Sequence, residues 1–322
     1  MYRKTFSVFL VLFLSIVLKA QQPSLTFTPH WLPQAQFAGY YMALEKGFYK
    51  NEGLDVKIVH PSASVNAIQS LNEGSSDIIS LFLITAISAK NDGVDLVNIA
   101  QLSQNSALMF VSKKERGLEK LSDLNNKSIG VWQSGFDEVG KALVSSQNYS
   151  VEWVPILSTI NMFMVDGIDA LTVMWYNEYY QIINAGIDSC ELNTFFFSDY
   201  GYNIPEDGLY CLNSTLNERS ADFEKFVKAT FKGWQYVADN FDETIDVVLR
   251  IMKENHVPTN RVHQQWMLHK VLELMDVGNK NVAVGELAET DFYKTQAILV
   301  EGGYVKNKII FTDFHHSIIN KP

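Results

Sequence analysis

The feature that most constrains the fold is residues 30–58, where a helical apolar stripe gives way to strand-like alternation. Apolar residues at 54–58 alternate with polar ones, and a short apolar strand is expected at 25–27. Gly47 and Gly53 fall where left-handed caps would end two short helical pieces. The sequence therefore predicts a strand–helix–strand unit whose helix buries five large side chains at helical spacing: Phe37, Tyr40, Tyr41, Leu44 and Phe48.

Helices and strands continue to alternate after this unit, which predicts a mostly parallel sheet with helices on both faces. A helix over 62–73 is expected to begin at Ser62 or Ser64, both good N-cap residues, and to end before Gly74. Further strands are expected at 77–80, 96–101 and 107–112, the last of which would cross to a second lobe.

The second lobe is expected to repeat the pattern, with helices at 137–146, 159–165 and 175–186 and strands at 128–131, 151–155, 169–174 and 192–197. Residues 208–212 would return the chain to the first lobe. Beyond Asn217 the hydrophobic pattern changes and predicts long amphipathic helices, over 221–240, 242–255, 259–274 and 290–301. We therefore divide the chain into a first lobe at 21–108, a second lobe at 109–208, and a return with C-terminal helices at 209–322.

The first 20 residues have the three parts of a secretory signal peptide. Arg3 and Lys4 form a basic start, residues 6–18 form an apolar core, and Ala20 precedes the expected cleavage point. A retained anchor is the alternative, but the apolar run is short for a membrane span. No later stretch is apolar enough to cross a bilayer. We therefore expect an exported, periplasmic protein.

The charge of the chain excludes one class of partner. The formal net charge is −10, and loss of the first 20 residues would remove basic residues only. Nucleic-acid binding needs a basic footprint, so no nucleic-acid partner is expected. The two cysteines, Cys190 and Cys211, could pair in an oxidising compartment, but both also fit small buried residues in apolar segments.

No catalytic motif stands out in the sequence. It contains no G-x-S-x-G, P-loop, G-x-G-x-x-G or H-E-x-x-H pattern. The seven histidines lack the spacing and the cysteine or carboxylate support of a metal site. Neither a metal nor another cofactor is expected.

The segment KGFYKNEGLDV, together with Trp31 and Pro33 ahead of it, resembles the periplasmic binding proteins for thiamine-pyrimidine precursors, sulfonates and nitrate. It is also similar to the yeast enzymes that make the thiamine pyrimidine. The resemblance covers most of the mature chain and is weakest beyond about Glu254. It implies a type II periplasmic binding protein fold, which is α/β with two lobes, and a monomeric solute receptor that docks on an ABC permease in the membrane.

On such a fold the loops that follow the strands face one cleft between the lobes. Several of these loops offer aromatic side chains beside polar ones, a combination that suits a flat heterocycle. The candidate ligand-binding residues are Trp31, Gln36, Tyr40, Ser62, Ser64, Phe82, Gln104, Trp132, Ser134, Trp175, Asn177, Glu178 and Glu206.

The charge of these loops distinguishes among ligands. They hold almost no Arg or Lys, whereas anion-binding relatives typically present basic groups or helix N-termini to a sulfonate or nitrate. Tyr176-Asn177-Glu178 resembles the Asn-Glu signature of the pyrimidine-binding branch, and Glu206 lies in a loop where that branch also contacts its ligand. Glu178 can equally be an acid that stabilises a helix N-terminus, and Glu206 an ordinary turn carboxylate. A thiamine pyrimidine precursor is the expected ligand, with alkanesulfonate, taurine or nitrate as the alternative.

An enzyme of the synthase type is the alternative from another class, and a sensor role is also open. The synthases that this sequence resembles consume one of their own histidines and hold pyridoxal phosphate on a lysine, in the segment that matches residues 76–90 here. In this sequence those positions are Leu81 and Thr85. The cysteine-rich loop of the synthase is missing as well. Without the lysine no Schiff base can form, so no enzymatic activity is expected.

Overall fold

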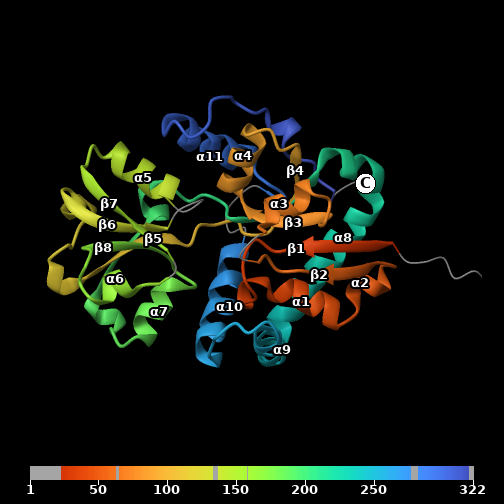
Figure 1. Ribbon diagram of the computed structural model, residues 1–322, viewed down its shortest axis with the longest axis horizontal. Coiled ribbons are helices and arrows are strands. Elements are labelled where there is room, and N and C mark those ends of the chain that lie inside the picture. Colours follow the sequence, from red (N-terminus) through yellow and green to blue (C-terminus); the bar gives the residue numbers. More distant parts are fainter. Residues whose placement is uncertain (1–22, 63–64, 133–136, 158, 277–281, 319–322) are drawn as a thin grey trace, which may run out of the picture.

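Two five-stranded sheets organise the chain into two lobes in the computed structural model, which describes residues 23–62, 65–132, 137–157, 159–276 and 282–318 (Figure 1). Sheet A has the order β2-β1-β3-β10-β4 and defines lobe 1, and sheet B has the order β7-β6-β8-β5-β9 and defines lobe 2. In each sheet one strand that has arrived from the other lobe, β10 or β5, runs antiparallel to its neighbours. The expected mostly parallel, mixed α/β architecture is confirmed.

The strands of sheet A are β1 (Ser24–Thr28), β2 (Asp55–Ile58), β3 (Ile78–Phe82), β4 (Leu96–Gln101) and β10 (Asp207–Leu212). Those of sheet B are β5 (Leu108–Lys113), β6 (Lys127–Trp132), β7 (Val151–Ile156), β8 (Ala170–Met174) and β9 (Leu192–Phe196). The helices α1 to α4 belong to lobe 1: α1 (Ala38–Glu45), α2 (Phe48–Asn51), α3 (Ala67–Asn72) and α4 (Leu83–Asn91). Those of lobe 2 are α5 (Asp137–Ser146), α6 (Asn161–Met164) and α7 (Glu178–Asn184).

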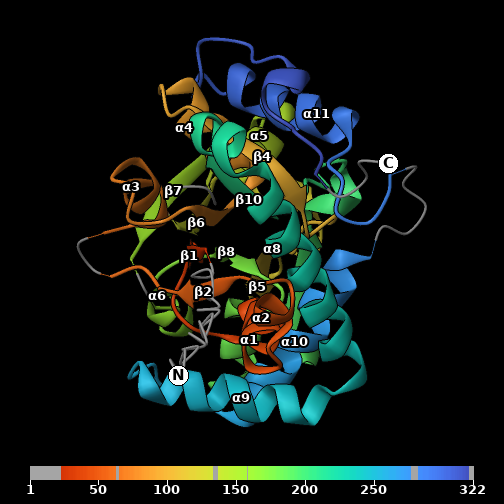
Figure 2. The same cartoon turned by 90° about the vertical axis from the view of Figure 1, so that its right-hand side faces the viewer.

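Four long helices follow β10: α8 (Asn213–Asp239), α9 (Phe241–Glu254), α10 (Arg261–Met275) and α11 (Glu289–Glu301). Helix α8 packs along α1, while α9 and α11 lie at opposite ends of the molecule (Figure 2). Helices α10 and α11 also reach lobe 2, where they pack against α7 and α5 respectively. Among the described residues, no helix combines the length and apolar character needed to span a bilayer.

The predicted strand–helix–strand unit is present and forms the centre of lobe 1. Phe27 of β1 is fully buried, and its ring centroid lies 4.4 Å from that of Tyr40 on α1. Helices α1 and α8 approach so closely at Gly39 that an added Cβ would lie 2.2 Å from the Trp234 ring. The predicted left-handed caps are confirmed, because Gly47 and Gly53 have φ angles of 69° and 80°.

Two chain segments cross between the lobes, and we call residues 102–107 and 197–206 the crossing segments. The sequence analysis placed the crossings at 107–112 and near 208–212, but residues 108–112 lie inside β5 and 208–212 inside β10, so each crossing comes just before the expected segment. The two crossing segments are joined to each other by hydrogen bonds. Ser106 N donates to Asn203 Oδ1 over 2.9 Å, and Asn203 Nδ2 donates to Asn105 Oδ1 over 2.9 Å.

Two helix starts differ from the sequence prediction. Helix α3 begins at Ala67 rather than near Ser62, because the side chain of Asn66 accepts a hydrogen bond from Gln69 N and caps it. Helix α8 begins at Asn213 and bends at Arg219, which has non-helical backbone angles. The Arg219 guanidinium donates to Asp77 Oδ1 over 2.6 Å, so this bend is held from lobe 1.

The cysteines do not form a disulfide in this structure. Both Cys190 and Cys211 are free. Cys211 is buried in β10 as expected, but Cys190 is exposed, which corrects the interpretation of both as buried residues.

Candidate functional site

A cleft lies where the carboxyl ends of four strands meet between the lobes, as expected for open α/β sheets. Lobe 1 contributes residues that follow β1 and the last residue of β3, Phe82. Lobe 2 contributes Trp132 at the end of β6 and residues that follow β8. The cleft holds two adjacent cavities that share His30, Trp31 and Phe82 in their walls.

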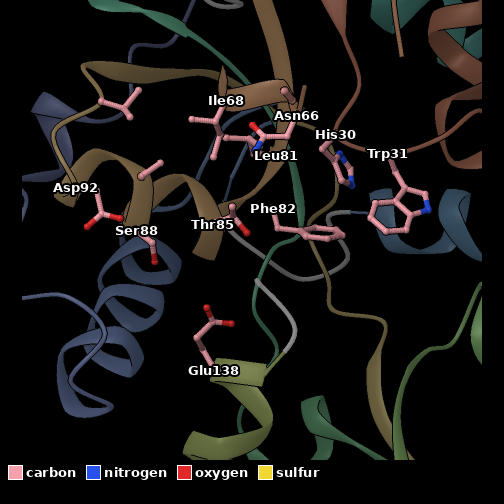
Figure 3. A pocket seen from close by; sticks show the side chains of 13 residues that line it. His30, Trp31, Asn66, Ile68, Leu81, Phe82, Thr85, Ser88, Asp92 and Glu138 are labelled. Carbon is pink, nitrogen blue, oxygen red and sulfur yellow. The ribbon is translucent and has the colours of Figure 1, made fainter. Parts of the chain in front are cut away.

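The first cavity, which we call the α7 cavity, has a volume of about 350 Å³. It is lined by His30, Trp31, Leu32, Gln34, Gln36, Phe82, Trp132, Met174, Tyr176, Asn177, Glu178, Gln181 and Pro258. The second, which we call the α4 cavity, has a volume of about 480 Å³ and is bounded by α3, α4 and the first turn of α5 (Figure 3). Both volumes lie in the range typical of small-molecule sites.

Trp31 is the most prominent side chain of the cleft. It lines both cavities and is 49% exposed, so much of its ring is open to contact. Its backbone is held by His60, whose Nδ1 lies 2.7 Å from the Trp31 carbonyl oxygen. A carbonyl can only accept, so Nδ1 carries the proton, and His60 Nε2 accepts from the Tyr41 hydroxyl over 2.8 Å. Burial lowers the pKa of His60 to about 4, which keeps the ring neutral at ordinary pH.

A chain of three polar side chains leads into the cleft from the lobe 1 side. Gln34 Nε2 donates to Gln36 Oε1 over 2.6 Å, and Gln36 Nε2 donates to Asp207 Oδ2 over 2.8 Å. Asp207 Oδ1 is buried and accepts no hydrogen bond from the described residues. Burial raises the pKa of Asp207 to about 7, and the Gln36 hydrogen bond opposes this rise. Asp207 therefore has one buried carboxyl oxygen without a hydrogen bond, and its carboxyl group can gain or lose a proton near neutral pH.

His30 lies beside this carboxyl group. Its Nε2 is 3.6 Å from Asp207 Oδ1, and its Nδ1 is 2.9 Å from Ser80 Oγ. Burial, with a smaller contribution from His60, lowers the pKa of His30 to about 3. The imidazole is therefore neutral at neutral pH, and the cleft carries no positive charge from it.

Glu178 lines the α7 cavity, but its carboxylate is already engaged. Oε2 accepts from Met174 N over 2.9 Å, and Oε1 accepts from Asn177 Nδ2 over 2.8 Å. Burial raises the pKa of Glu178 above its ordinary value. The residue thus closes the turn between β8 and α7, which is the structural alternative that the sequence left open.

Glu206 is the last residue of one crossing segment and contacts the other. Its Oε1 accepts from Ala107 N over 2.6 Å and from Ser106 Oγ over 3.1 Å. Burial raises its pKa to about 8. Together with Asp207, Tyr40 and Gln36 it lines a small cavity of about 10 Å³ behind the cleft, and neither Glu206 nor Asp207 lines one of the two large cavities.

Other predicted site residues lie away from the two cavities. Trp175 packs against α10, where Trp266 Nε1 donates to the Trp175 carbonyl over 3.0 Å and Lys270 Nζ lies 4.0 Å from the centre of its ring. Gln104 is buried, and its Nε2 donates to the backbone carbonyls of Gln101 and Glu286. Ser62 is exposed ahead of α3. Ser64 and Ser134 lie outside the described residues.

Sequence reasoning did not select His30, Gln34 and Tyr176, which line the α7 cavity, or Asp207 behind it. Each is a neighbour, or a near neighbour, of a residue that was chosen, so they belong to the same loops. Tyr176 is buried beside Gln36 and lines the α7 cavity, whereas the preceding Trp175 does not.

The lining has a distinctive charge. No Lys or Arg lines either cavity among the described residues, whereas Asp92, Glu138 and Glu178 do. Within the described ranges, no three His, Cys, Asp or Glu side chains gather in a way that would hold a metal ion. The arrangement suits an uncharged or positively charged ligand with aromatic character.

The structure as a whole has the fold of the periplasmic binding proteins. It matches the periplasmic aliphatic sulphonate binding protein SsuA from Escherichia coli with a TM-score of 0.72 and 12% identity, over 93% of this chain and 92% of that one. Residues 34–244 match the NMT1/THI5-like family, and the chain belongs to that family.

Two bacterial relatives are similar to this chain over most of their length. The chain is 25% identical over 258 residues to the formylaminopyrimidine-binding protein of Halalkalibacterium halodurans, covering 77% of each chain. It is 24% identical over 247 residues to the riboflavin-binding protein RibY of Chloroflexus aurantiacus, covering 72% of this chain and 68% of RibY.

Proposed function

We propose that this chain is the exported solute-binding protein of an ABC importer, and that it captures an aminopyrimidine such as a thiamine precursor in the α7 cavity. The observation that carries the proposal is the pairing of aromatic walls with the amide of Gln36 in a cavity without Lys or Arg lining, backed by Asp207, which accepts from Gln36 and keeps a second buried oxygen without a hydrogen bond. The names of the two bacterial relatives, which refer to a pyrimidine and to a larger nitrogen heterocycle, support the same ligand class.

In this proposal Trp31 and Trp132 provide aromatic faces from the two lobes. Gln36 lines the cavity and contacts the pyrimidine, and the carboxyl group of Asp207 behind it orients the Gln36 amide by accepting from Nε2. Asn177 at the start of α7 supplies a second polar contact from lobe 2. No chemical step is proposed, because Leu81 and Thr85 stand where the synthases would need a histidine and a lysine.

Calorimetry with an aminopyrimidine and with an alkanesulfonate tests the ligand class. We expect the pyrimidine to bind, and Asp207→Asn to weaken it by about tenfold to a hundredfold, the effect of losing a hydrogen bond to a charged group. Glu206→Gln is the matched control, because the Glu206 carboxyl group already accepts a hydrogen bond from Ala107 N. Binding of the sulfonate alone would replace the pyrimidine with the anionic alternative.

The same titrations decide which carboxyl group serves the ligand. If Glu178→Gln or Glu206→Gln weakens pyrimidine binding and Asp207→Asn does not, the assignment made from the sequence holds and Asp207 is structural. If none of the three variants weakens it, the ligand class stands without a carboxylate contact.

Export and the transport role rest on the N-terminal segment. Sequencing of the native protein should begin near Gln21 or Gln22, because the first 20 residues have the pattern of a signal peptide. An intact Met1 on the soluble native protein would contradict export, and with it the role in an importer.

A further inference from the structure

We propose that three side chains of α10 position the two lobes for ligand binding: Trp266 and Lys270 hold lobe 2, and Gln264 holds the part of lobe 1 that carries Gln36. We call these three residues the α10 brace. None of them lines the α4 cavity or the α7 cavity, so they are positioning residues. The expected effect on affinity rests on the proposed function, whereas the arrangement of the lobes can be measured without a ligand.

Helix α10 reaches both lobes and a crossing segment. Figure 1 shows it between α7 of lobe 2 and α1 of lobe 1, and it packs against α7, α9 and the short 3-10 helix at Ala35–Phe37. Its last turn is bonded to a crossing segment, because the Leu274 carbonyl accepts from the backbone N–H groups of Gln104 over 2.8 Å and Asn105 over 3.1 Å. One end of α10 is therefore fixed where the lobes are joined, and its earlier turns contact each lobe separately.

Trp266 holds the turn of lobe 2 that leads into the α7 cavity. Its Nε1 donates to the Trp175 carbonyl over 3.0 Å. Its ring stacks on Tyr180 of α7, with the ring centroids 4.8 Å apart and the planes 17° apart. Trp175 directly precedes Tyr176, which lines the α7 cavity. Trp266 therefore fixes the backbone beside a cavity residue without reaching the cavity itself.

Lys270, one helical turn beyond Trp266, places a positive charge between two indole rings. Its Nζ lies 4.0 Å from the centre of the Trp175 ring and 5.1 Å from the centre of the Trp266 ring, both within the range of cation–π attraction. The Lys270 side chain is only 16% exposed, and its Nζ also donates to Glu273 over 2.8 Å. Because Trp175 belongs to lobe 2 and Trp266 to α10, moving lobe 2 away from α10 would cost the ammonium group one of its two rings.

Gln264, two residues before Trp266, holds lobe 1. It is buried, its Oε1 accepts from Ala35 N over 2.8 Å, and its Nε2 donates to Thr259 Oγ1 over 2.8 Å. With both ends of the amide occupied, the side chain has one orientation. Ala35 directly precedes Gln36, which lines the α7 cavity. The backbone beside Gln36 therefore has a fixed position relative to α10.

The two sets of contacts meet within two turns of one helix, so the α10 brace sets the distance between cavity walls that come from different lobes. The α7 cavity needs residues of lobe 1, such as Gln36, to face residues of lobe 2, such as Asn177. Loss of the lobe 2 contacts lowers the population of this arrangement, and the apparent affinity falls in proportion to that population.

Scattering and calorimetry on the full mature chain test the brace with Trp266→Phe and Lys270→Met, singly and together. Trp266→Phe keeps an aromatic ring for Tyr180 but removes the donor to Trp175, and Lys270→Met removes the charge but keeps a long side chain. We expect the double variant to be more extended without ligand and to bind the aminopyrimidine about fivefold to a hundredfold more weakly, the effect of one hydrogen bond and one cation–π contact.

Two controls accompany the double variant. Lys294→Met, which removes an exposed lysine on α11, controls for net charge and should leave scattering and affinity unchanged. Saturating aminopyrimidine should return the double variant to the scattering profile of the liganded wild type, because the ligand replaces the lost contacts between the lobes.

Gln264→Leu tests the lobe 1 side separately. The unliganded scattering should stay as in the wild type, because the contacts with lobe 2 remain. The affinity for the aminopyrimidine should fall about twofold to tenfold, because Ala35 N loses its acceptor. Gln264→Glu keeps an acceptor for Ala35 N and should recover part of the loss. Equal affinities in the wild type and Gln264→Leu would overturn the role of Gln264.

Several outcomes would overturn the brace. They are unchanged unliganded scattering in the double variant, normal affinity in that variant, or an equal effect of Lys294→Met. A lower melting temperature with normal scattering and affinity would show that the cluster only packs, which also overturns the proposal. If the wild type binds an alkanesulfonate and no aminopyrimidine, the proposed function fails, while the unliganded scattering still decides whether α10 holds the lobes.

Discussion

The carboxylate of Glu206 accepts a hydrogen bond from the backbone N–H of Ala107 over 2.6 Å, and this bond joins the two crossing segments. Glu206 ends one crossing segment and Ala107 ends the other, so both segments must keep their relative position at this point. Any opening of the cleft must therefore bend the chain on either side of this contact or break it. Because Glu206 is only 5% exposed, its protonation state affects the stability of the fold.

We predict that stability falls between pH 6.5 and pH 8 and that Glu206→Gln reduces this fall. The pKa of Glu206 is raised to about 8 by burial, so the native state binds more protons than the unfolded state between its ordinary pKa and pH 8. The stabilisation is present at low pH and is lost as the pH rises through 8. Over this interval one proton corresponds to about 2 kcal/mol at most. Urea unfolding of both proteins at pH 6.5, 7.2 and 8 measures it.

The choice of interval separates Glu206 from the buried histidines. His30 and His60 have pKa values lowered to about 3 and about 4, so they destabilise the fold as the pH falls below 6.5 and have no effect above it. Asp207, with a pKa raised to about 7, acts in the same direction as Glu206 but over a lower range. Equal pH slopes for wild type and Glu206→Gln would show that Glu206 is ionised in the native protein throughout.

Gly39→Ala should destabilise lobe 1 by at least about 1–3 kcal/mol, the usual cost of overpacking a core. The new methyl group would lie 2.2 Å from Trp234, so α1 and α8 would have to separate. Gly47→Ala is the matched control, since its Cβ meets no atom within 4 Å and only the left-handed backbone opposes it. Thermal unfolding of each variant, and of Gly39→Ala with Trp234→Leu, measures the effect. The double variant should recover part of the loss; no recovery would place the clash elsewhere.

His60→Ala should weaken ligand binding about twofold to tenfold without touching the ligand. The imidazole fixes the backbone of Trp31, and a net hydrogen bond of about 0.5–1.5 kcal/mol would be lost. Tyr41→Phe should have a smaller effect, because it removes only the group that orients His60. Calorimetry with the ligand of the wild type gives both values. A normal affinity in His60→Ala, beside a strong loss in Trp31→Ala, would mean that other contacts hold the Trp31 loop.

Ligand binding should make the particle more compact, because two lobes joined by short crossing segments can close as rigid bodies. Small-angle scattering with and without saturating ligand measures the change. Trp266→Ala should make the unliganded particle more extended, since Trp266 of α10 donates to the Trp175 carbonyl of lobe 2 and stacks on Tyr180 at 4.8 Å. Identical scattering of wild type and variant would show that this contact does not hold the lobes together.

The strands and most helices could be predicted because their signals are local. The strand expected at 96–101 coincides with β4, since a buried apolar run bounded by turns needs no distant partner to be recognised. The bend in α8 could not be predicted, because Arg219 pairs with Asp77, which lies 142 residues away in the sequence. The start of α3 was missed because Ser62, Ser64 and Asn66 are all suitable caps.

The candidate site shows the same limit at finer scale. Pattern alone located the loop at Glu206 and Asp207, but not what each carboxyl group contacts. Those partners are distant in the sequence, because Glu206 accepts from Ala107 N and Asp207 accepts from Gln36 Nε2. Trp175 and Tyr176 differ for a similar reason: of the two adjacent aromatic rings, one packs on α10 and the other lines the cavity.

The antiparallel strand β10 also sets the order in which the two lobes can be completed during synthesis. Sheet B is made entirely from residues between Leu108 and Phe196, so every strand of lobe 2 has been synthesised before β10. Sheet A, which starts first, lacks the strand that joins β3 to β4 until residue 212 has been added. The lobe that begins the chain is therefore the last to become whole, and a nascent chain stalled before β10 exposes an unpaired edge of β3.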